Sequence, residues 1–115
     1  MKLVVYIMSD TTKLDKFLHA LKEKNINGAT ILKGTGMARK LIANDDMEFI
    51  GSLKVLFDNP RVESDVVLMA LEEPQVEVVF ETIKEVVGDL TCPNCGIAFT
   101  VPIDHIVGLT KKNKQ

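Results

Sequence analysis

The residues best suited to chemistry in this sequence are two cysteines separated by two residues, Cys92 and Cys95. A CxxC pair can close a tight disulfide or offer two thiolates to a soft metal ion. Thioredoxin-type chemistry needs such a pair at a helix N-terminus, where the dipole lowers a thiol pKa, but this pair precedes a predicted strand. A structural zinc ion takes about four ligands, of which one CxxC supplies half. Three hypotheses remain: ordinary turn residues, a redox switch, and a metal site completed by symmetry-related copies.

The other polar groups do not form a catalytic pattern. The sequence has no Ser-His-acid order, no phosphate-binding lysine loop of the Walker type and no paired acids within a glycine-bounded site. Glu72 and Glu73 open a predicted helix, where acidic residues complement the helix dipole. His105 follows Asp104 directly after a predicted strand, where a histidine is more often simply hydrogen-bonded. We therefore predict a protein that acts by binding and is not an enzyme.

Composition favours one globular domain over residues 1–115, since 46% of the 115 residues are apolar. The net charge of -2 gives no field that would attract nucleic acid or an anionic membrane. The basic tail, residues 110–115, is typical of a solvated chain end. No segment resembles a secretory signal, and the cysteines lie too close together for a secreted disulfide framework, so we expect a cytoplasmic protein.

Hydrophobic periodicity predicts four strands and two helices, which must position the cysteines and the polar residues named above. The strands are expected at Leu3–Met8, Ala29–Leu32, residues 66–71 and residues 96–103. The first helix is capped within residues 9–12, carries Leu14, Phe17, Leu18 and Leu21 on one stripe, and ends at residues 25–28. The second helix is expected to have Pro74 at its first position and to stop at Gly88. Its predicted buried stripe is Val76, Val79, Phe80, Ile83 and Val87. Its predicted exposed residues are Glu77, Glu81, Lys84 and Glu85. Residues 35–62 are expected to form one long effector loop with helical pieces.

The order strand, helix, strand, long connection, strand, helix, strand is that of a split βαβ arrangement. We predict an α+β, ferredoxin-like βαβ-βαβ fold with a four-stranded antiparallel sheet. Two helices can cover only one face of such a sheet, yet the first and third strands are apolar on both faces. In the first strand, Val4, Tyr6 and Met8 lie on one face and Leu3, Val5 and Ile7 on the other. Large exposed apolar areas are rare on monomers. The uncovered face is therefore expected to pack against other subunits.

Several segments together resemble the nitrogen regulatory protein P-II superfamily, in particular its P-II-like branch. They are Gly28-Ala29-Thr30-Ile31-Leu32-Lys33-Gly34-Thr35-Gly36-Met37, Phe49-Ile50-Gly51-Ser52-Leu53, Val86-Val87-Gly88-Asp89-Leu90 and the segment from Gly96 to Leu109. The resemblance implies a homotrimer, with the sheets lining its centre, that senses a small effector. It also implies a partner protein whose activity is modulated, such as a membrane transporter or a regulatory enzyme.

The resemblance further implies an adenine nucleotide in clefts between subunits. By position, the cofactor-binding residues would be Thr30, Gly34, Thr35, Gly36, Gly88, Asp89 and Gly96. Glycines there would let backbone amides approach phosphate oxygens, although Gly34 and Gly36 could equally serve only to turn the chain, and the position of Gly88 favours a helix stop. No cofactor is expected to be obligatory.

The sequence departs from the signalling P-II pattern before its last strand. Residues 90–95 replace the family's glycine- and lysine-rich phosphate loop, and no lysine or arginine lies between Glu85 and Lys111. We therefore expect weak nucleotide binding. The long loop has no tyrosine, which removes covalent nucleotidylation of that loop. The alternative function is a trimeric metal-homeostasis protein, similar to the divalent-cation tolerance family, that would retain metal through Cys92 and Cys95.

Overall fold

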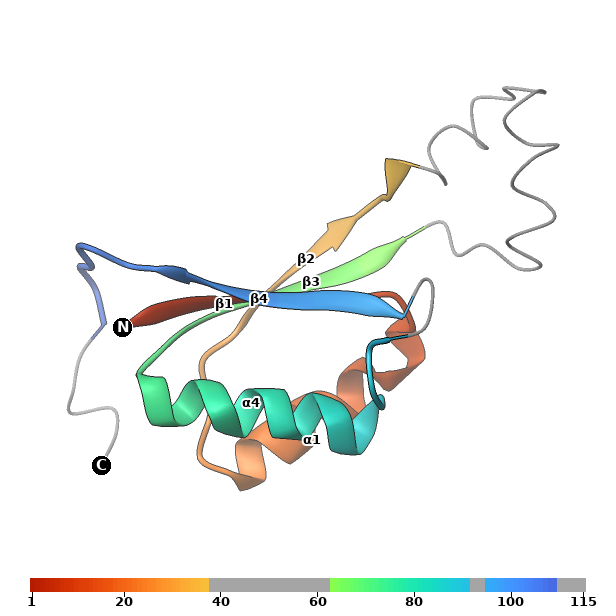
Figure 1. Cartoon of the computed structure of the whole chain (residues 1–115), viewed down its shortest axis with the longest axis horizontal. Helices are drawn as coiled ribbons and strands as arrows, with labels where there is room; N and C mark the ends of the chain where they lie inside the picture. The colour runs from red at the N-terminus through yellow and green to blue at the C-terminus, as the bar shows by residue number, and fades with distance from the viewer. Residues whose placement is uncertain (38–62, 92–94, 110–115) are drawn as a thin grey trace, which may run out of the picture.

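The computed structural model describes residues 1–37, 63–91 and 95–109. These residues form an α+β fold in which two α-helices lie against one face of a four-stranded antiparallel sheet (Figure 1). The elements are β1 (Lys2–Met8), the 3-10 helix η1 (Thr11–Lys13), α1 (Leu14–Glu23), β2 (Thr30–Gly34), β3 (Ser64–Leu71), α4 (Glu73–Val86) and β4 (Gly96–Pro102). The four predicted strands and two predicted helices are confirmed. Most of the expected long loop, and the basic tail, lie outside the described residues.

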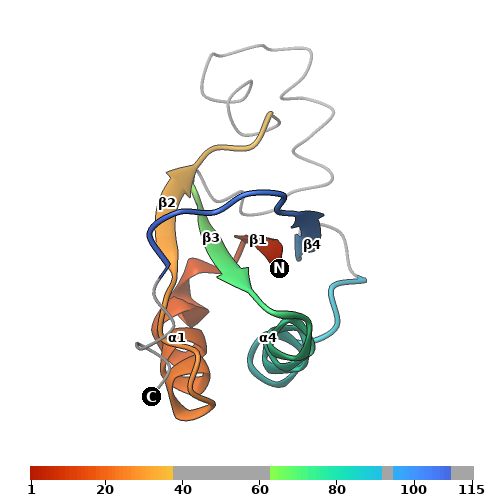
Figure 2. The same cartoon turned by 90° about the vertical axis from the view of Figure 1, so that its left-hand side faces the viewer.

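The strands have the order β2-β3-β1-β4, and each neighbouring pair is antiparallel. Strands β1 and β3 therefore occupy the centre, while β2 and β4 form the two edges. Both helices lie below the sheet when it is viewed end-on (Figure 2). This arrangement is compatible with a ferredoxin-like fold.

The core lies between the sheet and the two helices. Its buried residues are Val4, Tyr6 and Met8 of β1, Val67, Met69 and Leu71 of β3, Phe17 and Leu21 of α1, Ile26, and Val76, Val79, Ile83 and Val86 of α4. The rings of Tyr6 and Phe17 pack edge to face with centroids 5.3 Å apart. Lys24 joins the helices, since its Nζ donates to Thr82 Oγ1 at 2.9 Å and to Glu85 Oε1 at 2.6 Å. Of the two apolar faces of β1, the one formed by Val4, Tyr6 and Met8 is buried against the helices.

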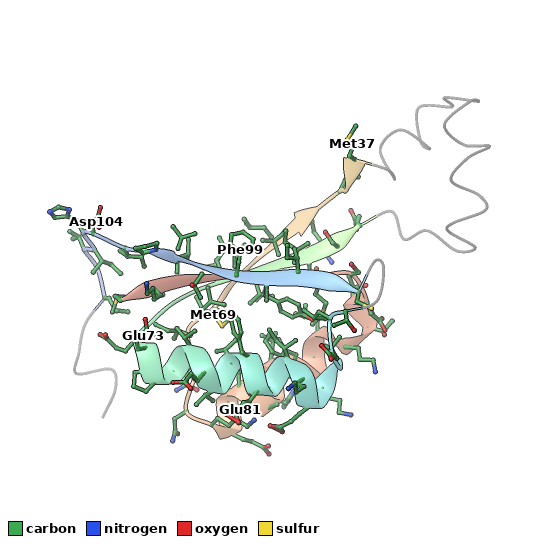
Figure 3. The ribbon with its side chains drawn as sticks, viewed as in Figure 1. Met37, Met69, Glu73, Glu81, Phe99 and Asp104 are labelled. Carbon is green, nitrogen blue, oxygen red and sulfur yellow. The ribbon has the colours of Figure 1, made fainter. Side chains whose placement is uncertain are left out.

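The opposite face of the sheet is apolar and has no covering layer in the described part of the chain. The strand register places Leu3, Val5 and Ile7 of β1, Val66, Leu68 and Ala70 of β3, Ile97, Phe99 and Val101 of β4, and Leu32 of β2 on this face. We call these ten residues the open face. Figure 3 shows Phe99 pointing away from the helices and Met69 pointing toward them. The exposed fractions of Leu32, Ile97 and Phe99 are 50%, 54% and 41%.

Local hydrogen bonds explain where the helices begin and end. The carboxylate of Asp10 accepts from the Thr12 backbone N–H at 3.2 Å, so the expected cap within residues 9–12 belongs to the 3-10 helix η1. Helix α1 follows with Lys13 as its N-cap and no side-chain cap hydrogen bond. Helix α4 begins at Glu73, so Pro74 occupies its second position and not the expected first. The N–H of Glu72 instead donates to Gln75 Oε1 at 3.1 Å.

The helix stops are also clear. Gly88 has a φ of 116° and donates its N–H to the Ile83 carbonyl at 3.1 Å, which confirms it as the stop of α4. Asn25, with a φ of 66°, ends α1 in the same left-handed region.

Candidate functional site

The seven predicted cofactor-binding residues fall into two groups at opposite edges of the sheet. Gly34, Thr35 and Gly36 follow one another at the end of β2, with Thr30 at the other end of that strand. Gly88, Asp89 and Gly96 border the connection from α4 to β4. Edges β2 and β4 are three strand spacings apart, about 14 Å, so one chain does not gather the two groups into one site.

The two groups nevertheless share one end of the sheet. Gly34 lies opposite Ser64, Met8 lies opposite Asp65, and Met8 also lies opposite Gly96. If the β2 edge of one chain met the β4 edge of a second chain, the two groups could therefore line a single cleft.

Two of the predicted glycines have structural reasons of their own. A Cβ at Gly96, where φ is 109°, would lie 2.5 Å from the Ile7 carbonyl oxygen. A Cβ at Gly34 would lie 3.2 Å from both Ser64 Oγ and a methyl group of Val66. The Ser64 hydroxyl also donates to the Gly34 carbonyl at 3.3 Å. These glycines let β1 and β4, and β2 and β3, pair closely, whereas nothing lies within 4 Å of a Cβ at Gly36.

An ion pair fixes the two strand ends from which the long connection starts and returns. The Nζ of Lys33 on β2 lies 2.9 Å from Oδ1 of Asp65, whose side chain is 2% exposed, on β3. The ammonium neutralises this carboxylate as an ion pair. Contact with Asp65, through donation to the carboxylate and through its negative charge, raises the pKa of Lys33.

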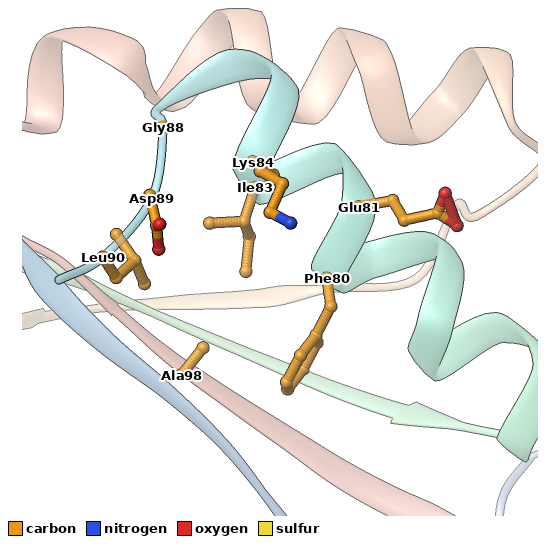
Figure 4. Close-up of a pocket in the computed structure, with 8 residues that line it drawn as sticks. All are labelled: Phe80, Glu81, Ile83, Lys84, Gly88, Asp89, Leu90 and Ala98. Carbon is orange, nitrogen blue, oxygen red and sulfur yellow. The ribbon is translucent and has the colours of Figure 1, made fainter.

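A pocket lies between α4 and the edge strand β4, and it contains two of the predicted residues (Figure 4). It has a volume of about 330 Å³ and is lined by Phe80, Glu81, Ile83, Lys84, Gly88, Asp89, Leu90 and Ala98. Ala98 is the residue of β4 that lines the pocket, on the helix side of the sheet opposite Tyr6. Phe80 was expected in the core stripe of α4, but it is 39% exposed and lines the pocket.

Lys84 and Glu81 are functional candidates that the sequence analysis placed on the wet side of the helix. Both line the pocket. Lys84 directly precedes the stretch from Glu85 to Lys111 that contains no lysine or arginine, so it is the cation next to the predicted loop. Helical spacing could have identified Lys84 in the sequence. It lies four residues before Gly88, which places both residues on the same side of α4 near its C-terminal end.

Cys95 is disulfide-bonded, and the sequence has one other cysteine, Cys92, which lies outside the described residues. A disulfide sulfur is not a thiolate, so in this state Cys95 is not a metal ligand of the expected kind. The redox switch stays a prediction. Cys95 follows Asp89 and Leu90 in the connection that borders the pocket.

The remaining titratable groups do not assemble into a reactive centre in the part of the chain that the structure describes. Tyr6 is buried beside Asp10; desolvation, and then that negative charge, raise its pKa to about 12, so it stays neutral at physiological pH. The predicted pair Asp104 and His105 is exposed. Residues 1–37, 63–91 and 95–109 hold no group of three or more histidine, cysteine, aspartate or glutamate side chains that could bind a metal ion.

No protein-family model matches the chain, and no curated protein matches it. Among the described residues, neither helix has the length and apolar character needed to cross a bilayer.

Proposed function

We propose that this protein is a P-II-like regulatory homotrimer with a ferredoxin-like fold, which binds a small effector between subunits and modulates a partner protein. The observation that carries the proposal is the open face. Its ten apolar residues span all four strands, with only Thr30, Gly34 and Ser64 beside them on that face of β2 and β3, and it lies opposite a face that the two helices already cover. Apolar surface of this extent is rarely left in water, and further copies of the same sheet are the partners that the resemblance to the P-II-like branch implies.

The placement of the predicted site residues supports a site between subunits. Gly34–Gly36 and the group Gly88, Asp89 and Gly96 lie at one end of the sheet but on opposite edges. Such an arrangement binds one molecule only where two edges of different chains meet. Adenine nucleotide is the proposed ligand of that cleft, and the connection after Gly36 is the proposed contact with a transporter or regulatory enzyme.

The cation-tolerance alternative has less support. It requires thiolates, whereas the sulfur of Cys95 is disulfide-bonded.

Two measurements test the proposal. Light scattering should give three times the chain mass of 12.7 kDa. Calorimetry should detect weak heat with ATP, ADP or AMP at millimolar concentration. A monomer mass over a wide concentration range would refute the trimer, and no heat and no thermal shift from any of the three nucleotides would refute the nucleotide.

A further inference from the structure

The pocket between α4 and β4 has an apolar floor that one chain builds alone. Phe80 and Ile83 of α4, Leu90 and Ala98 form this floor (Figure 4). Its volume of about 330 Å³ is at the lower end of the range of small-molecule sites. A ligand of this pocket should therefore be small and partly apolar.

Two charges of opposite sign stand at the rim of this floor. Lys84 and Asp89 both line the pocket, both are exposed, and neither has an ion pair within the described ranges. Glu81 also lines the pocket, but its carboxylate extends away from Asp89 (Figure 4). The pocket thus offers the ammonium of Lys84 and the carboxylates of Asp89 and Glu81, and none of the three forms an ion pair within the described ranges.

We propose that the pocket binds a small apolar α-amino acid. Lys84 would pair with the ligand carboxylate, Asp89 with its ammonium, and the aliphatic side chain would lie over Phe80, Ile83 and Ala98. A simple anion would gain Lys84 but face the carboxylates of Asp89 and Glu81, and a simple amine would gain a carboxylate but leave Lys84 without a counter-charge. The zwitterion satisfies both charges at once, which is the complementarity that gives specificity.

This site differs from the nucleotide cleft, although Gly88 and Asp89 border both. A polyphosphate would meet one lysine and two carboxylates here, so the charges disfavour it. Binding of an amino acid in this pocket does not depend on the proposed function. Only its role as an effector of a regulatory protein rests on that function.

L-leucine is the test ligand, titrated into the full-length protein by calorimetry or NMR to about 10 mM, because so few atoms give modest affinity. Three analogues each remove one feature: 4-methylpentanoate lacks the ammonium, 3-methylbutylamine lacks the carboxylate, and glycine lacks the apolar side chain. We expect each analogue to bind about tenfold more weakly than leucine, or worse. Equal binding of leucine and either singly charged analogue would overturn the zwitterion assignment, as would no binding of leucine at all.

Matched variants place the site. Ala98→Leu should fill the pocket and abolish leucine binding, whereas Thr100→Leu, on the same face of β4 but outside the pocket, should not. Lys84→Gln should weaken binding about tenfold, and Lys22→Gln, an exposed lysine of α1, should leave it unchanged. Circular dichroism confirms that each variant is folded, and the Lys84 pair decides the question if Ala98→Leu does not fold. Unchanged leucine affinity in folded Lys84→Gln would overturn the proposal.

Measuring leucine binding together with the oligomeric state separates this inference from the proposed function. Because the pocket residues all belong to one chain, leucine should bind a monomer as well as a trimer. Leucine binding by a protein that proves monomeric would refute the trimer and keep the pocket. A trimer that shows no leucine heat would refute the pocket and keep the trimer.

Discussion

Gly96 illustrates how a residue expected at a binding site can be required by the fold. It begins β4 opposite Met8, with a φ of 109°, and an added Cβ would meet the Ile7 carbonyl oxygen at 2.5 Å. That oxygen belongs to the backbone of the central strand β1 and cannot move aside without disturbing the sheet. The glycine is therefore explained before any ligand is invoked.

We predict that Gly96→Ala lowers the free energy of unfolding by about 2 kcal/mol or more, since a strained φ and a backbone clash add. Urea denaturation measures it. Gly28→Ala is the matched control, because a Cβ there would meet nothing within 4 Å. Equal stability of the two variants would mean that the start of β4 can shift freely.

Lys33 belongs to the same end of the sheet, where it neutralises the buried Asp65 carboxylate. We predict that Lys33→Met lowers the unfolding midpoint at neutral pH, because it leaves that carboxylate without its cation. Lys16→Met, on an exposed lysine with no ion pair among the described residues, should have little effect.

The stabilisation by the Lys33–Asp65 ion pair should depend on pH in a defined direction. Because the pKa of Lys33 is raised in the folded state above its ordinary 10.5, the stabilisation is full below pH 10.5 and is lost as pH rises through the folded-state value. The midpoints of wild type and Lys33→Met should therefore converge above that pH. A constant difference up to the highest pH measured would contradict the ion pair.

At the scale of elements, periodicity predicted most of the architecture from the sequence. Alternation identified Val4, Tyr6 and Met8 as one face of β1, and the stripe of α4 was right at Val76, Val79 and Ile83. These predictions succeeded because burial on one face leaves a period of 2 or 3.6 in the sequence.

The pocket was not predicted from the sequence, and the reason is the position of the sheet edge. Phe80 has the spacing of a core residue, but it is 39% exposed and lines the pocket beside the edge strand β4. Lys84 is exposed, as predicted, and it also lines this pocket. A helical period shows which side of a helix faces the sheet, but it does not show where the sheet ends. The pocket depends on that edge and so could not be read from periodicity alone.

The connection from α4 to β4 is the element that carries both Cys95 and part of the pocket wall. We predict that reducing its disulfide changes global stability by less than about 2 kcal/mol, because a four-residue loop restricts few unfolded conformations. The effect should instead be local, seen as faster hydrogen exchange of residues 88–91 and 95–96 and as an altered affinity for pocket ligands.

A thiol count with and without reductant, alongside hydrogen exchange, measures this prediction. Cys95→Ser should reproduce the exchange pattern of the reduced wild type. Thiols that resist mild oxidants, or exchange rates that do not respond to oxidation, would leave Cys92 and Cys95 as ordinary turn residues.

At the scale of the whole molecule, the two faces of the sheet give adjacent residues different roles. Val67 is fully buried against the helices, whereas Leu68 belongs to the open face and lies opposite Val5 and Thr30. If the open face is the centre of a trimer, a charge on one side of β3 should unfold the chain, and a charge on the other side should separate the subunits.

We predict that Val67→Asp prevents stable folding, since an unpaired carboxylate in the core costs several kcal/mol. Leu68→Asp should keep the circular dichroism of a folded chain, while its mass by light scattering falls from three chains to one. Asn27→Asp, which adds the same charge at an exposed loop position, should remain trimeric.

The comparison within β3 makes this a test of the interface and not of stability in general. Both aspartates enter the same strand, one residue apart, and differ only in the face that they reach. A folded, trimeric Leu68→Asp protein would exclude the open face as the subunit contact. Unfolding of both variants would call for Phe99→Asp, at an open-face position 41% exposed in the single chain, where a charge can dissociate subunits without entering the helix-side core.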